Sequence, residues 1–212
     1  MFPVLYAILD PSLISIPIVR FAENLAASGV QLIQLRDKQA ASAQLFAQSR
    51  DLAAALRPTG AKFIVNDRAD IAAVADASGV HVGHDDLPPE AAREIVGTSR
   101  WVGVSTHNIE QFAEAGATSA DYIAVGPVFP TASKANPDPV VGLELLRAAR
   151  KLTNKPIVAI GGITLERAAS VFEAGADSVA VIRDLLCAAD PTVRAREFMA
   201  IGEAIRKEKG PK

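Results

Sequence analysis

The sequence predicts an α/β fold, a single (β/α)8 TIM barrel in which residues 1–212 form one catalytic domain. Three observations carry this prediction. Short runs rich in valine, isoleucine and leucine recur along the chain, alanine-rich segments with helical spacing separate them, and one phrase repeats at the junctions. Strands that alternate with helices favour parallel pairing through right-handed crossovers. Eight such units suit a small barrel, and a doubly wound open sheet is the alternative.

The expected strands are nearly continuous apolar runs, which is typical of strands covered on both faces. They lie at residues 4–9, 32–36, 62–65, 79–83, 101–105, 121–126, 156–161 and 178–183. The repeated phrase reads ASGVQLIQL at 27–35, ASGVHVG at 77–83, AGATSADYIAVG at 115–126 and AGADSVAVI at 174–182. It predicts a recurring helix end, short link and strand.

The intervening segments place apolar residues on one helical face, as at Leu45, Leu52 and Leu56. Helix ends are expected at Gly29, Gly79, Gly116 and Gly175, because glycine adopts the left-handed backbone at low cost.

The composition argues against several classes of partner. The chain is 50% hydrophobic and 22% charged with a net charge of −2, which predicts neither nucleic acid nor an anionic membrane as a partner. No apolar run approaches the roughly 18 residues of a membrane span, and the N-terminus lacks the features of a signal peptide. The lone Cys187 excludes an internal disulfide and fits a cytoplasmic location. We expect it to be a small apolar core residue.

Polar side chains follow most of the expected strands. They are Arg36, Asp37 and Lys38; Asn66, Asp67 and Arg68; His84, Asp85 and Asp86; Ser105, Thr106, His107 and Asn108; the loop 126–139; Gly161 and Gly162; and Arg183 and Asp184. The carboxyl ends of parallel barrel strands share one rim, where barrel enzymes hold their active sites. Burying so many unpaired charges for structure alone would be costly. We therefore expect a site at this rim.

The signs of charge indicate the ligand. Arg36, Lys38, Lys134 and Arg183 form a cationic set, and Gly161-Gly162 opens a helix whose N–H groups suit a phosphate. Asp67 and Asp86 supply the hard oxygen ligands that Mg²⁺ prefers. Together these groups predict a phosphorylated ligand, with a diphosphate bound through Mg²⁺.

Each of these residues also has a purely structural interpretation. Asp67 could cap the next helix or pair with Arg68, and Asp86 could cap a helix that starts near Pro88. Lys134 could be a solvated loop residue, and the two glycines could serve only a turn. The three histidines do not form a zinc cluster, and His81 is expected to be a hydrogen-bonded core residue.

A series of motifs gives a more specific indication. The motifs are QLRDK (34–38), VNDRADIA (65–72), GVHVGHDDLP (79–88), VGVSTHN (102–108), DYIAVGPVFPTASK (121–134), VAIGGI (158–163) and AGADSVAVI (174–182). In this order, over nearly the whole chain, they resemble the thiamine-phosphate synthase family, also called thiamine-phosphate pyrophosphorylase. The resemblance implies a Mg²⁺-dependent (β/α)8 barrel that joins a hydroxymethylpyrimidine diphosphate to a thiazole phosphate and releases pyrophosphate. It also implies that the pyrimidine diphosphate ionises first and that the thiazole nitrogen captures the carbocation.

The resemblance assigns roles to residues of this chain. The pyrimidine diphosphate would be bound by Gln34, Leu35, Arg36, Asp37, Lys38, Asn66, Ser105 and Lys134, of which Arg36, Ser105 and Lys134 would be catalytic. The thiazole phosphate would be bound by Thr131, Ala132, Ser133, Gly162, Ile182 and Arg183, and Mg²⁺ by Asp67 and Asp86. The partners implied are small phosphorylated molecules, and a homo-oligomer is compatible with the sequence.

Three positions depart from the family's pattern. Arg183 stands where serine is frequent, Ala132 replaces a hydroxyl residue, and His84 replaces glutamine. Two other functions remain open at this point: a thiazole tautomerase-like isomerase of the same superfamily, and a non-catalytic sensor of a phosphorylated ligand. Neither requires the combination of acidic pair and cations.

Overall fold

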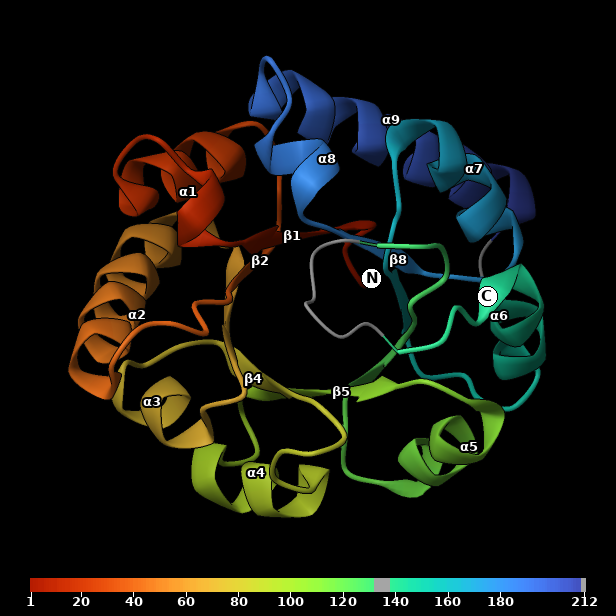
Figure 1. Ribbon diagram of the computed structural model, residues 1–212, viewed down its shortest axis with the longest axis horizontal. Helices are drawn as coiled ribbons and strands as arrows, with labels where there is room; N and C mark the ends of the chain where they lie inside the picture. The colour runs from red at the N-terminus through yellow and green to blue at the C-terminus, as the bar shows by residue number, and fades with distance from the viewer. Residues whose placement is uncertain (132–137, 211–212) are drawn as a thin grey trace.

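The computed structural model of the protein describes residues 1–131 and 138–210, in which eight parallel strands close into a barrel (Figure 1). Neighbours along the chain pair with one another, and β8 pairs with β1 to complete the ring. The strands are β1 (Leu5–Leu9), β2 (Leu32–Leu35), β3 (Lys62–Asn66), β4 (Gly79–Val82), β5 (Trp101–Thr106), β6 (Tyr122–Val125), β7 (Ile157–Ile160) and β8 (Ser178–Val181). The predicted (β/α)8 barrel is confirmed, and the open sheet is excluded.

Helices surround the strands on the outside of the ring (Figure 1). They are α1 (Ile18–Ala27), α2 (Ser42–Leu56), α3 (Ala69–Val74), α4 (Pro89–Val96), α5 (Ile109–Ala117), α6 (Gly142–Arg150), α7 (Leu165–Glu173), α8 (Arg183–Leu186) and α9 (Pro191–Lys209), with short 3-10 turns at Pro11–Leu13 and Arg57–Thr59. The helix α8 has only 4 residues, and the 19-residue α9 packs against α7 and α1 in the outer ring. No helix within the described ranges is long and apolar enough to cross a membrane.

Strand residues alternate between two apolar layers. One set, which includes Leu9, Ile33 and Val65, packs with the helices in the main core. The other set fills the barrel interior and consists of Tyr6, Ile8, Leu32, Ile64, Tyr122, Ala124, Val158 and Ala180. Because successive side chains of a strand point to opposite faces, burial on both faces explains the nearly continuous apolar runs.

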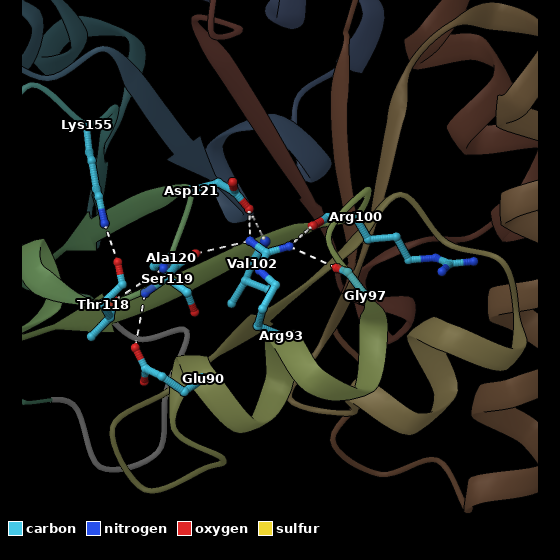
Figure 2. A network of polar contacts seen from close by, with 10 residues as sticks. All are labelled: Glu90, Arg93, Gly97, Arg100, Val102, Thr118, Ser119, Ala120, Asp121 and Lys155. Atoms are coloured by element: carbon cyan, nitrogen blue, oxygen red, sulfur yellow. Dashed lines mark hydrogen bonds and ion pairs between the residues drawn. The ribbon is translucent and has the colours of Figure 1, made fainter.

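The repeated sequence phrase corresponds to a repeated contact at the amino ends of the strands. Asp121 precedes β6, and its Oδ2 accepts hydrogen bonds from Val102 N at 2.7 Å and from Arg93 Nη2 at 2.5 Å (Figure 2). Asp177 precedes β8, and its Oδ2 accepts from Ile157 N at 2.9 Å and from Arg150 Nη1 at 2.6 Å. These contacts lie at the end of the barrel that, in this fold, serves stability rather than catalysis.

Two of the four expected helix-ending glycines have that role. Gly29 and Gly175 follow α1 and α7 with φ of 105° and 115°. The expectation was wrong for Gly116, which lies within α5, and for Gly79, which begins β4. A Cβ on Gly79 would lie 2.2 Å from the carbonyl oxygen of Trp101, so this glycine permits a close approach of β5.

Candidate active site

The carboxyl ends of the strands surround a cavity of about 1230 Å³. Most residues that the sequence predicted for a site line this cavity: Gln34, Arg36, Lys38, Asn66, Asp67, Asp86, Ser105, Thr131, Gly162, Ile182 and Arg183. They come from loops and strand ends distributed around the barrel. The predicted convergence of polar strand ends on one rim is therefore observed.

Two predicted contacts lie elsewhere. The side chain of Leu35 is fully buried in the main core, because alternation along β2 turns it toward the helices while Gln34 faces the barrel interior. The Asp37 carboxylate accepts hydrogen bonds from the backbone of Gln39 and Ala40, so it shapes the loop. Predictions for Ala132, Ser133 and Lys134 fall outside the described residues.

The acidic pair of the rim consists of Asp67, which follows β3, and Asp86, in the loop after β4. Their side chains are within hydrogen-bonding reach of each other, and Lys38 Nζ lies 3.2 Å from Asp67 Oδ2. Partial burial raises the pKa of Asp67, Lys38 opposes this shift, and the neighbouring Asp86 adds to it. Two carboxylates held this close repel each other when both are ionised, so a cation bound between them would be stabilised.

Local backbone geometry fixes both acids in place. Asp67 adopts a left-handed backbone with φ of 62°, which aspartate tolerates better than most residues, and its N–H donates to His81 O at 2.8 Å. Asp86 Oδ2 accepts a hydrogen bond from Gly83 N at 2.9 Å. A Cβ on Gly83 would lie 2.8 Å from that oxygen, so the glycine makes room for the carboxylate.

The structural interpretations of the two acids are not borne out. Arg68 donates to Asp70 and to Ser42 rather than to Asp67. The helices α3 and α4 begin without a side-chain cap, so neither Asp67 nor Asp86 serves as one. The geometry instead leaves two hard oxygen donors at the cavity, and this donor set fits a divalent cation such as Mg²⁺.

A second region of the cavity surrounds the glycine pair after β7. Gly161 and Gly162 adopt φ of 96° and 62°. A Cβ on Gly162 would lie 2.3 Å from Pro130 O, so only glycine fits this approach. Arg167 lines the cavity here, donates to Gly162 O at 2.7 Å and stacks over the Phe129 ring at 4.7 Å. The region combines the Arg167 guanidinium with a glycine backbone that a ligand can approach closely, and this combination suits a phosphate group.

The barrel floor contains a serine and a histidine spaced like a nucleophile and its base. Ser105 Oγ lies 2.8 Å from His81 Nε2. Burial, however, lowers the pKa of His81 to about 4, which makes it a weak base at neutral pH. Its Nδ1 lies 3.1 Å from the Tyr122 hydroxyl rather than from a carboxylate. The pair therefore lacks the features that activate a serine for acyl transfer.

Sequence reasoning missed several residues that line or support the cavity. Tyr6 lines the cavity and Tyr122 packs beside it, and their only sequence signal is a hydroxyl at an inward position of an apolar strand. Arg167 gave no signal because it falls in the first turn of a helix. Cys187 was expected in the core, but it is exposed and lines the cavity.

Comparisons with known proteins agree with this geometry. A family model described as thiamine monophosphate synthase matches residues 5–185. A thiamine-phosphate synthase of Koribacter versatilis (strain Ellin345) is 53% identical over 206 residues, which cover 94% of this chain and 95% of the relative. A thiamine-phosphate synthase of Methanospirillum hungatei is 42% identical over 180 residues, covering 85% of this chain and 87% of the relative.

Solved structures give the same result. A thiamine phosphate pyrophosphorylase from Pyrococcus furiosus superposes with a TM-score of 0.85 at 34% identity, covering 95% of this chain and 96% of that structure. A 3-hexulose-6-phosphate synthase, at 20% identity and a TM-score of 0.64, shares the fold alone. Taken with the motifs gathered at the rim, these matches show that the chain belongs to the thiamine monophosphate synthase family.

Proposed function

We propose that the protein condenses 4-amino-2-methyl-5-hydroxymethylpyrimidine diphosphate with 4-methyl-5-(2-phosphoethyl)thiazole, or with its carboxylated form. The products are thiamine phosphate and pyrophosphate. One observation carries this proposal: a single cavity contains two regions that suit phosphorylated groups. One region has the acidic pair Asp67 and Asp86 beside Lys38, and the other has the turn at Gly162 beside Arg167. Two phosphorylated substrates need two such anion sites. The curated relatives named thiamine-phosphate synthase support the same reaction.

The acidic pair is the proposed magnesium site. Asp67 and Asp86 would hold the ion, and their carboxylates fit it because Mg²⁺ takes one or two carboxylates together with substrate phosphates. Bound Mg²⁺ would neutralise charge on the diphosphate and so make pyrophosphate a better leaving group. The adjacent Lys38, 3.2 Å from Asp67, would face the same anion.

The remaining residues divide between the two substrates. Gln34, Arg36, Lys38, Asn66 and Ser105 are proposed to bind the pyrimidine diphosphate. Lys134, outside the described residues, is proposed to join Arg36 in stabilising the leaving group. The thiazole phosphate is assigned to Thr131, Ala132, Ser133, Gly162, Ile182 and Arg183, and Arg167 is added because it lines the cavity beside Gly162.

The proposed chemistry requires positioning more than a protein nucleophile. The bond between the pyrimidine methylene carbon and the diphosphate oxygen breaks, and pyrophosphate leaves with the electron pair. The thiazole nitrogen then donates its lone pair to the methylene carbon. A cavity that holds both reactants raises their effective concentration. Preorganised cations stabilise the charge that develops on the departing oxygen.

The reaction is tested by mixing the purified protein with both substrates and Mg²⁺, then measuring thiamine phosphate and pyrophosphate. The proposal expects equal amounts of the two products and none when either substrate is omitted. Conversion of the thiazole phosphate to an isomer without pyrophosphate release would favour the isomerase. Binding of both substrates without turnover would favour the sensor.

Two further expectations accompany this function. We propose a cytoplasmic location, because the lone cysteine suits a reducing compartment, and cell fractionation tests it. A homo-oligomer is compatible with the sequence, and sedimentation of the purified protein would establish the number of subunits.

A further inference from the structure

A chain of hydrogen bonds runs across the floor of the cavity and links five strands. Gln34 Nε2 donates to the Tyr6 hydroxyl at 2.6 Å, and the hydroxyls of Tyr6 and Tyr122 lie 3.0 Å apart. The Tyr122 hydroxyl lies 3.1 Å from His81 Nδ1, and His81 Nε2 lies 2.8 Å from Ser105 Oγ. Both ends of the chain, Gln34 and Ser105, line the cavity, as do Tyr6 and His81.

The middle of this chain is built into the barrel. Tyr6, Tyr122 and His81 are 1%, 0% and 8% exposed, so their polar atoms depend on one another for hydrogen bonds. Gly103 makes the arrangement possible, because a Cβ there would lie 2.1 Å from Tyr122 Cζ. Phe2 packs on the same tyrosine, with ring centroids 5.3 Å apart. The tyrosine hydroxyl is therefore held in one place.

The donor at Gln34 allows all the hydrogen bonds of the chain to run in one direction. Each tyrosine hydroxyl has one hydrogen to donate. Tyr6 accepts from Gln34 Nε2, and either hydroxyl of the tyrosine pair can donate to the other. If the Tyr6 hydrogen goes to Tyr122, the Tyr122 hydrogen is available for His81 Nδ1. A neutral imidazole that accepts at Nδ1 carries its hydrogen on Nε2 and donates to Ser105.

This direction determines what each end offers to a ligand. Ser105 accepts from His81, so its own hydroxyl hydrogen is available for donation into the cavity. One of the two Gln34 amide hydrogens goes to Tyr6, and this orientation of the amide leaves its carbonyl oxygen to accept from a ligand. One donor and one acceptor match a 4-aminopyrimidine, whose amine donates and whose ring nitrogen accepts. A 4-oxopyrimidine presents the opposite pattern.

We propose that Tyr6, Tyr122 and His81 are positioning residues that fix the hydrogen-bond polarity of Gln34 and Ser105, and thereby select a 4-aminopyrimidine diphosphate over its 4-oxo analogue. The inference rests on the proposed function, since it concerns the pyrimidine substrate of that reaction. It adds a selectivity determinant that acts through Gln34 and Ser105. Reversal of the chain would invert both ends together, because each tyrosine hydroxyl and the neutral imidazole have a single hydrogen to donate.

The kinetic test compares kcat/KM for the amino and oxo substrates in the wild type and in Tyr122→Phe. Loss of the hydroxyl frees His81 and Ser105 to adopt either polarity, so the amino-to-oxo ratio should fall tenfold or more. An unchanged ratio would overturn the proposal. Phe2→Leu is the matched control, because it disturbs packing on the same ring but removes no hydrogen bond. It should slow both substrates equally and keep the ratio.

A second test needs no substrate. Nitrogen-15 NMR of the free protein reports which imidazole nitrogen of His81 carries the hydrogen, and His84→Gln and His107→Gln assign the signal among the three histidines. Protonated Nε2 is expected, and protonated Nδ1 would overturn the inference even if Tyr122→Phe does not fold. Absence of pyrophosphate release by the wild type would refute the proposed function instead, so the two failures are distinguishable.

Discussion

Asp67 and Asp86 lie within hydrogen-bonding reach of each other at the cavity, although they follow different strands. Two carboxylates this close repel each other when both are ionised, and burial of Asp67 increases the cost. The raised pKa of Asp67 means that, without a cation, the folded state loses stability as the pH rises through that pKa. A divalent cation between the two would remove this penalty.

Asp67→Asn should abolish the stabilisation of the protein by Mg²⁺. Thermal unfolding at pH 8 should show a wild-type Tm that rises by about 2–4 °C in saturating MgCl₂, because a ligand that binds only the folded state stabilises it. The variant should show no rise, and in metal-free buffer it should be at least as stable as the wild type. Asp70→Asn is the control, since Asp70 pairs with Arg68 away from the cavity. An equal rise in both variants would contradict a metal role for Asp67.

Protonation of His81 should contribute to acid unfolding. Its pKa is about 4 in the folded protein and near 6.5 when unfolded, so between these values the unfolded chain binds the extra proton. Stability is therefore lost as the pH falls from 6.5 to 4, by about 3 kcal/mol in total. Urea unfolding across this range should show a shallower pH dependence for His81→Asn than for the wild type. Parallel curves would show that His81 is not buried in its neutral form.

Gly162→Ala should impair the thiazole phosphate site specifically. An added Cβ would lie 2.3 Å from Pro130 O and would push the turn out of place. The KM for the thiazole phosphate should rise at least tenfold, while the KM for the pyrimidine diphosphate should change little. Gly60→Ala is a matched control, since Gly60 also has a positive φ of 77° but no atom within 4 Å of an added Cβ. It should cost only about 1 kcal/mol of stability. Equal effects of both variants on KM would argue against a site at Gly162.

Asp121→Ala should destabilise the fold without altering the chemistry. The change would leave Val102 N–H and the Arg93 guanidinium without the carboxylate that they share (Figure 2). Chemical denaturation should show a loss of about 2–4 kcal/mol, while kcat of the folded enzyme stays the same. Asp51→Ala, which removes an exposed pair with Arg50, should cost less than about 1 kcal/mol. A large fall in kcat for Asp121→Ala would link this end of the barrel to the active site.

The sequence was most informative where burial dictates composition. Strands enclosed on both faces appear in the sequence as apolar runs. The polar residues that follow these runs predicted a site at the rim of the barrel. Glycines were less informative, because the same residue type serves two purposes. Gly29 adopts the left-handed backbone at a helix end, whereas Gly79 allows a close approach between strands. Leu35 was assigned to the site with its neighbours, although strand alternation already places it on the opposite face from Gln34.

Contacts between distant segments could not be predicted. Tyr6 and Tyr122 are 116 positions apart, and His81 and Ser105 are 24 apart. The periodicity of the sequence does not show which inward-facing residues lie at the same height in the barrel, because this height depends on the register between strands. The floor of the site therefore emerged only from the structure, whereas its rim was visible in the sequence.

The central claim is that the rim holds a diphosphate through a cation bound by Asp67 and Asp86. Calorimetric titration of the wild type with inorganic pyrophosphate, with and without Mg²⁺, tests it most directly. We predict binding at least tenfold tighter with Mg²⁺, and loss of that gain in the Asp67→Asn, Asp86→Asn double variant. The same affinity with and without Mg²⁺ in the wild type would contradict the claim.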